Sequence, residues 1–272
     1  MRRAVRLVPL ALLGSLAVPH AARCQSGSRA ASAVGLSLGL TGFHQRDEYL
    51  SPVTYGGTIL SAALTYERRA ARSLFTAEVT FAQGAINSAA LPRDVIQHVG
   101  RVAVAQLGAL GGADAGPRPL TVFVGGGLSS FGSITEFRAT DPRSGYSYTD
   151  ASWYWSHNLD LALRGEYRGR SRLFALTLTA PVVRLVSRPA NGKFFNADNA
   201  RVYDHWLNAM TGGRLELPWD DLALSGEAEY RQPLGHRLQL RAAYAFGCAS
   251  SGRPLAMGMY MNRLLVGLLW TR

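Results

Sequence analysis

Apolar and polar residues alternate along a segment in the middle of the chain, from Trp153 to Tyr167. One face carries Trp153, Trp155, Leu159, Leu161, Leu163 and Tyr167, and the other carries Tyr154, Ser156, Asn158, Asp160, Arg164 and Glu166. Because side chains of a strand point to alternate faces, one face is apolar with aromatic residues at both ends, and the other is polar. This pattern is typical of a strand that separates hydrocarbon from a polar lumen, so it predicts a transmembrane β-strand.

The same alternation recurs along the chain and predicts ten strands. Their ranges are 33–43, 57–68, 73–83, 96–110, 120–137, 153–167, 172–184, 221–231, 237–247 and 260–270. Short and long connections alternate between them, as in a barrel with short periplasmic turns and long outer loops. We therefore expect an all-β fold, a transmembrane antiparallel up-and-down β-barrel. The segment 202–217 is either loop structure or an extra hairpin, and we favour the loop, which gives ten strands rather than twelve.

The first 24 residues have the layout of a secretory signal peptide. Arg2, Arg3 and Arg6 precede an apolar run over 7–18 that is too short to cross a bilayer as a helix. Cleavage after Cys24 would leave a single barrel domain over 25–272. The alternative is a lipoprotein acylated on Cys24, which the bulky Arg23 before it disfavours.

Composition narrows the class further. No apolar run after the signal approaches the roughly 20 residues of a membrane helix, although 47% of the chain is hydrophobic. Only Cys248 remains after cleavage, so no internal disulfide is possible. The formal charge of +11 falls to 11 − 4 = +7 when four arginines leave with the signal. The remaining arginines are scattered rather than clustered, which argues against nucleic acid and favours contact with anionic lipid head groups.

The signal peptide, the alternating strands and an apolar last strand with Leu264, Val266, Leu268 and Trp270 together resemble those of bacterial outer-membrane β-barrel proteins, porins among them. The resemblance covers nearly all of 25–272. It implies location in the outer membrane of a Gram-negative-type bacterium, with outer-membrane lipid and the barrel assembly machinery as partners. Such barrels commonly end on an aromatic residue that this machinery reads, whereas here Trp270 is followed by Thr271 and Arg272.

Eight charged residues fall on the predicted lumen face. They are Glu67, Glu78, Asp160, Arg164, Glu166, Glu227, Glu229 and Arg241. Because an unpaired charge inside a narrow barrel is costly, we expect carboxylate–arginine pairs there. The pairs either fill the lumen as a structural network or line a charged constriction that biases ion passage.

Other candidate chemistry is weaker. Ser156, His157 and Asp160 have the residue types of a hydrolase triad, but His157 falls on the opposite face from the other two. Two predicted loops hold possible cation ligands, with His44, Asp47, Glu48 and Ser51 in one and Asp198, Asp204 and His205 in the other. The second loop also carries Phe194, Phe195, Tyr203 and Trp206, an aromatic load that suits a lid or a partner surface.

One glycine-rich stretch, Gly125 to Gly127, predicts a bulge or a tight bend in its strand. It lacks the helix start and the Lys-Ser/Thr pair that a phosphate-binding loop requires.

We therefore expect a non-enzymatic barrel without a cofactor, either a narrow porin-like channel or a structural membrane protein with interacting surface loops. A membrane-embedded lipid-modifying enzyme is the main alternative, and it requires a His and a Ser or Glu converging at one rim. A soluble periplasmic β-barrel binding protein is the other alternative, in which the leucine-rich faces would pack inward.

Overall fold

The computed structural model describes residues 31–48, 51–88, 94–110, 120–140, 147–189, 212–252 and 255–272. These residues form eleven β-strands. They are β1 (Ala31–Asp47), β2 (Ser51–Arg69), β3 (Ser73–Ile86), β4 (Asp94–Leu110), β5 (Leu120–Thr140), β6 (Ser147–Arg168), β7 (Leu173–Ser187), β8 (Arg214–Glu216), β9 (Ala223–Pro233), β10 (Leu238–Ser251) and β11 (Met257–Thr271). In this part of the chain no helix is long and apolar enough to cross a membrane.

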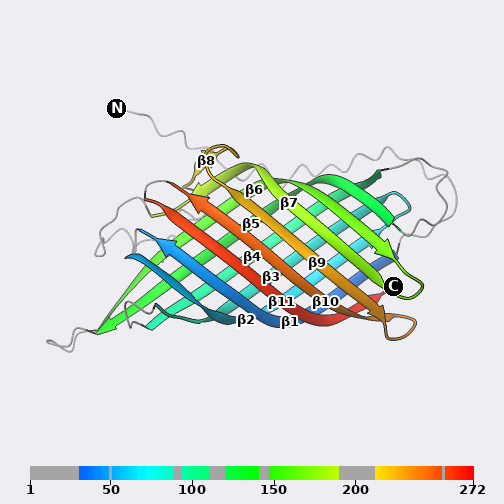
Figure 1. Ribbon diagram of the computed structural model, residues 1–272, viewed down its shortest axis with the longest axis horizontal. Coiled ribbons are helices and arrows are strands. Elements are labelled where there is room, and N and C mark those ends of the chain that lie inside the picture. The colour runs from blue at the N-terminus through cyan, green and yellow to red at the C-terminus, as the bar shows by residue number, and fades with distance from the viewer. Residues whose placement is uncertain are drawn as a thin grey trace.

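Ten of the strands close into one antiparallel barrel, with strands that tilt strongly across its long axis (Figure 1). Chain neighbours pair from β1 to β7 and from β9 to β11, β11 returns to β1, and β7 joins β6 to β9. The three-residue β8 pairs only with the far end of β7. The predicted all-β fold and the count of ten barrel strands are confirmed. The predicted signal peptide lies outside the described residues.

The strands are longer at one end than predicted. β1 continues to Asp47 and β2 begins at Ser51, so the long loop expected over 44–56 is wrong. The prediction failed because the outward residues of β1 change from leucine to polar types after Leu40, as in a loop. The hydrogen-bond ladder with β2 nevertheless continues to Asp47. The hairpin of β5 and β6 is the most extended, with 21 and 22 residues, and it projects beyond its neighbours in Figure 1.

The outward face of the barrel is an apolar belt. Leu36 is 60% exposed, Leu38 64% and Leu60 72%, in a chain whose inward-facing Ser37 is only 1% exposed. Aromatic side chains that are exposed near the end with the short turns are Tyr66, Tyr167, Phe174 and Trp270. Such a belt with interfacial aromatic residues is characteristic of membrane barrels. The alternative of a soluble periplasmic binding protein is therefore wrong. It requires the leucine-rich faces of the strands to be buried, and here they are exposed.

The glycines at 125–127 do not form a bulge, one of the two features predicted for them. Both neighbouring strands keep a continuous register past them. A Cβ atom on Gly125 would lie 2.1 Å from the carbonyl oxygen of Gln106. Glycine at this position therefore permits a close backbone approach, which is the other common role of a glycine inside a strand.

A bulge does occur in β7. Asp160 pairs with Pro181 and Leu159 pairs with Val183, so Val182 is an extra residue in the ladder. Proline suits this place because it has no N–H for the ladder. The extra residue changes which positions face the lumen, so that Arg184 points inward and is 2% exposed. The bulge thereby supplies the lumen with a charge that simple alternation would place outside.

We expect deletion of Val182 to keep the barrel folded, with a change in unfolding free energy within about 1 kcal/mol, because the ladder on both sides keeps its register. Deletion of the outward-facing Val79 in the regular strand β3 is the matched control. That deletion flips every later side chain of its strand and should cost more than about 4 kcal/mol. Urea unfolding in lipid vesicles measures both, and equal losses would contradict the assigned bulge.

Candidate functional site in the lumen

The eight charged residues predicted from the sequence come from five strands, β2, β3, β6, β9 and β10. All eight make polar contacts inside the barrel. Seven of them join one connected network of ion pairs, and Asp160 instead accepts a 2.5 Å hydrogen bond from the Ser129 hydroxyl. Glu166 is 0% exposed and Glu229 is 4% exposed. Charges so deeply buried are stable only when paired and hydrogen-bonded, which this network achieves.

Glu229 has three guanidinium partners in the network, all within 2.8 Å. Its oxygens lie 2.8 Å from Nη2 of Arg164, 2.7 Å from Nε of Arg231 and 2.7 Å from Nε of Arg241. Arg164 extends the chain of contacts to Glu166 at 2.8 Å. Charge-assisted hydrogen bonds of this length are the strong class, and a shared carboxylate couples the three arginines into one unit.

Several ion pairs cross the lumen between strands that are not neighbours. Arg231 on β9 reaches Glu67 on β2 at 2.6 Å, and Arg69 on β2 reaches Glu166 on β6 at 2.7 Å. The Arg69 guanidinium also lies 5.5 Å from the ring centre of Phe123. These contacts join opposite walls of the barrel. The paired side chains lie near the short turns, so they occupy that end of the lumen.

Five arginines of the network were missed by the sequence analysis. They are Arg69, Arg101, Arg168, Arg231 and Arg263. Arg69 and Arg168 fell at predicted turns, and the other three lay on inward positions that a strict count of alternate residues would have included. Their partners could not have been found, because Arg263 on β11 meets Glu78 on β3 only after the barrel closes.

A second set of ion pairs lies at the end with the long connections. Arg188 is 2.7 Å from Asp47, and Arg184 is 2.9 Å from Glu216 on β8. Glu216 also pairs with Arg214. These contacts attach the segment around β8 to the rim. Asp47, expected in a loop cation site, is instead a buried strand residue with an arginine partner.

Above the first charged network and reaching the height of the second, the lumen contains a cluster of apolar side chains, called the apolar layer below. Its buried members are Phe43, Tyr55, Ile59, Ala82, Ile86, Val95, Val99, Phe131, Tyr154, Val186, Met257 and Met259. Phe43, Ile59 and Ile86 are at most 1% exposed. Buried polar side chains lie at the same height, where Gln97 donates to the Ser133 hydroxyl at 2.8 Å and accepts from the Thr135 hydroxyl at 2.7 Å. Apolar and hydrogen-bonded side chains therefore fill this part of the lumen together.

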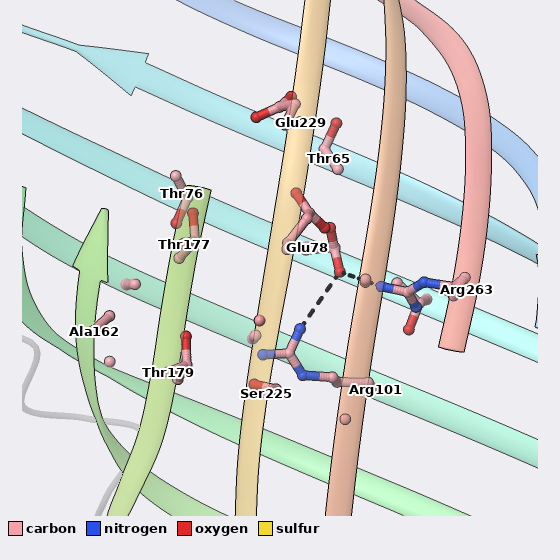
Figure 2. Close-up of a pocket in the computed structure, with 18 of the residues that line it drawn as sticks. Thr65, Thr76, Glu78, Arg101, Ala162, Thr177, Thr179, Ser225, Glu229 and Arg263 are labelled. Atoms are coloured by element: carbon pink, nitrogen blue, oxygen red, sulfur yellow. Dashed lines mark hydrogen bonds and ion pairs between the residues drawn. The ribbon is translucent and has the colours of Figure 1, made fainter. Parts of the chain in front are cut away.

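A cavity of about 210 Å³ lies between this layer and the charged network. Figure 2 shows Glu78 between Arg101 and Arg263, with the hydroxyls of Thr177, Thr179 and Ser225 on the facing wall. Glu78 lies 3.4 Å from Arg101 and 3.2 Å from Arg263. The apolar side chains of Val99 and Phe131 line it as well as belonging to the apolar layer. The cavity therefore has charged and hydroxyl groups beside a largely apolar lining.

The remaining candidate sites are not assembled. His44 is exposed on the outer face while Asp47 is buried inside, so the first predicted cation cluster does not converge. No group of three or more metal-ligating residues occurs in the described ranges. The second cluster and the aromatic residues expected around it lie outside the described residues. His157 sits outward and Ser156 inward, so the triad does not form.

One pair that the sequence analysis did not foresee does converge at the rim. His98 Nε2 lies 3.6 Å from Glu136 Oε1 on the outward face of β4 and β5. The nearby hydroxyls of Thr135 and Ser152 are buried in the lumen. The pair has the residue types of a base and an orienting carboxylate, but these two hydroxyls point away from it.

Comparisons with known protein families and with curated proteins each find no match. Solved structures do match. The outer-membrane protease OmpT from Escherichia coli aligns over 89% of this chain and 96% of its own, with 10% identity and a TM-score of 0.50. Neisserial surface protein A aligns over 88% and 97% with 8% identity and a TM-score of 0.37. The attachment invasion locus protein Ail of Yersinia pestis aligns over 89% and 99% with 8% identity and a TM-score of 0.35.

This chain has the fold of the outer-membrane β-barrels, and the resemblance drawn from its sequence is confirmed. At 10% identity the alignment with the protease relates the fold alone, so its activity does not transfer to this chain.

We expect Glu229→Gln to lower the unfolding free energy by about 3–5 kcal/mol, because three buried guanidiniums lose their shared carboxylate. Urea unfolding in lipid vesicles measures the loss. Glu48→Gln is the matched control, because the Glu48 side chain is 40% exposed and its ion pair with Arg46 is long, at 3.6 Å. We expect this control to change the unfolding free energy by no more than about 0.5 kcal/mol. Similar losses in both variants would show that the network does not stabilise the barrel.

Proposed function

We propose that this protein is an outer-membrane barrel with an occluded lumen, serving as a structural membrane protein that presents its extended outer strand ends, and not as an open porin. The observation that carries the proposal is the double closure of the lumen. Ion pairs that cross between β2, β6 and β9 occupy one level, and the buried apolar layer occupies another.

Either closure alone would oppose the passage of solutes. An ion entering the lumen at the apolar layer would have to displace buried side chains that fill it, such as Phe43 and Ile59, and lose hydration in doing so. At the other level, a solute would have to separate guanidiniums from carboxylates at 2.6–2.8 Å, as between Arg231 and Glu67. The cavity of about 210 Å³ is lined by residues of both levels, such as Glu229 of the network and Phe131 of the apolar layer.

The extended hairpin of β5 and β6 suits a surface role. Its ladder runs without a break from the pair Leu120 and Tyr167 to the pair Thr140 and Ser147. A transmembrane strand needs only about 9–11 residues. About half of this hairpin therefore extends outside the bilayer, where the hydrogen bonds between its two strands keep it rigid.

Location in the outer membrane is part of the proposal. The signal peptide predicted over 1–24 would bring the chain to the periplasm, and the outward leucine belt supports insertion into lipid. The barrel assembly machinery and outer-membrane lipid are the partners that this route implies.

A lipid-modifying enzyme is the second candidate, favoured only by the outward pair of His98 and Glu136. It would place a base at the level where lipid head groups meet the barrel. The candidate ranks second because Thr135 and Ser152 are 2% and 1% exposed and face the lumen. A nucleophile would have to come from elsewhere.

We expect the refolded barrel to give no single-channel steps in a planar bilayer, because both closures must open before ions can pass. Insertion is verified separately by protease protection, so that silence is informative. Discrete, reproducible steps would contradict occlusion and support the narrow-channel reading. In that case Glu227→Gln together with Glu229→Gln should change ion selectivity, since both carboxylates would line the constriction.

A further inference from the structure

Five exposed arginines lie at the end of the barrel with the short turns, and they are called the basic rim below. They are Arg68 and Arg72 at the turn between β2 and β3, Arg170 and Arg172 in the turn between β6 and β7, and Arg237 in the turn between β9 and β10. Figure 1 shows the last two turns at the same end as the C-terminus. These arginines are far apart in the sequence, so only closure of the barrel brings them to one end.

The guanidiniums of the basic rim have no partner among the residues that the structure describes, by hydrogen bond or by ion pair. Glu67 and Glu166, the acidic residues nearest to these turns along the strands, are buried and paired within the lumen network. Arg168 differs from the basic rim, because it lies 3.6 Å from Glu166. The basic rim therefore presents positive charge to solvent without a carboxylate beside it.

The opposite end of the barrel has a different balance of charge. There Arg184, Arg188 and Arg214 each form an ion pair with a buried carboxylate, and Arg46 pairs with Glu48. Arginines at that end thus serve contacts within the barrel. The basic rim serves no such contact in the described part of the chain, which points to a partner outside it.

The turns hold the basic rim on a fixed backbone. The N–H of Ala70 donates to the Ser73 carbonyl at 2.9 Å, and the N–H of Gly169 donates to the Arg172 carbonyl at 2.9 Å. Little backbone order would be lost on binding, which lowers the entropic cost of association. In the closed sheet β4 and β5 separate β3 from β6, and β11 and β1 separate β10 from β2. The charges are therefore spread around the barrel mouth, which suits an extended partner.

The height of the turns favours a partner in water over lipid head groups. The exposed aromatic side chains of Tyr167 and Phe174 mark the end of the apolar belt on β6 and β7. Arg170 and Arg172 lie in the chain between these two aromatic residues, past the last ladder pair of the hairpin. The turn thus carries its arginines beyond the membrane interface.

We propose that the basic rim docks the barrel on the peptidoglycan layer, a network of glycan strands whose peptide stems carry free carboxylates. Guanidiniums bind carboxylates through paired N–H donors, and a repeating polyanion can meet charges from several turns at once. The inference rests on the proposed outer-membrane location, with the short turns in the periplasm. It does not depend on whether the lumen is open, because the basic rim takes no part in the ion pairs that cross the lumen.

Co-sedimentation with purified peptidoglycan sacculi tests the proposal, with the full chain in phosphatidylcholine nanodiscs. We expect barrel-loaded nanodiscs to sediment with native sacculi while empty nanodiscs stay in solution. Salt at about 1 M, where screening acts within about 3 Å, should lower the affinity about tenfold. Sacculi whose carboxylates have been amidated are the ligand control, and their affinity should also be about tenfold lower, because no charged pair can form.

Two double variants locate the binding surface. Arg170→Gln with Arg172→Gln should weaken binding to native sacculi about fivefold, since two exposed ion pairs are lost. Arg46→Gln with Arg214→Gln is the matched control, because it removes the same charge from partly exposed arginines at the opposite end. Its affinity should stay within about twofold of that of the unchanged chain, since the two ends lie further apart than the Debye length of about 10 Å.

Equal binding to native and amidated sacculi, equal losses in the two double variants, or no sedimentation of loaded nanodiscs would overturn the proposal. Binding to anionic phospholipid vesicles without binding to sacculi would also overturn it and would make a lipid surface the partner. Failure to enter the nanodisc would instead count against the membrane location, and conductance in a planar bilayer would count against occlusion alone, so these failures are distinguishable.

Discussion

The need to neutralise charge inside a closed barrel governs the rest of this structure. Strands that alternate leucine with glutamate or arginine can turn their apolar side to lipid only if the charges meet partners within the lumen. Glu229 meets that need for three arginines at once, and Arg231 extends the contacts across the lumen to Glu67. The same contacts that satisfy the charges also cross the lumen, so the proposed occlusion would follow from the need for stability. Seven arginines and five glutamates form this network, which leaves little freedom for a single residue to change alone.

The barrel extends beyond the end of its apolar belt. The ladder of β1 and β2 continues past the belt to Asp47, and that carboxylate then pairs with Arg188 beyond the end of β7. Apolar side chains such as Phe43 and Ile59 fill the lumen at this height, so the outer part of the barrel has a core of its own. Closed paired strands leave no free edge, which lets such an extension stand in water without pairing to other chains. The surface role proposed for the molecule depends on this rigidity.

Sequence patterns predicted the fold well because a period of two is local and the membrane imposes it on every strand. Ten strands were placed, with their lumen faces, from residues such as Leu60 and Glu67. The strand ends beyond the belt were missed, since a polar strand outside the membrane and a loop look alike in composition. The bulge at Val182 was also missed, because Pro181 alone is a weak signal and only the register with β6 reveals the extra residue. Contacts across the lumen depend on closure of the barrel, so sequence could supply the charges but not their pairing.

The central claim, that ion pairs across the lumen hold the barrel closed, is tested most directly by a double-mutant cycle on Glu67 and Arg231. These side chains are 2.6 Å apart and come from strands separated by three others. Unfolding free energies of Glu67→Gln, Arg231→Gln and the double variant give the coupling. We predict a coupling of about 1–3 kcal/mol, as measured for residues in one buried network. Additive losses, with a coupling near zero, would contradict the account and would mean that the two walls are held by the backbone ladder alone.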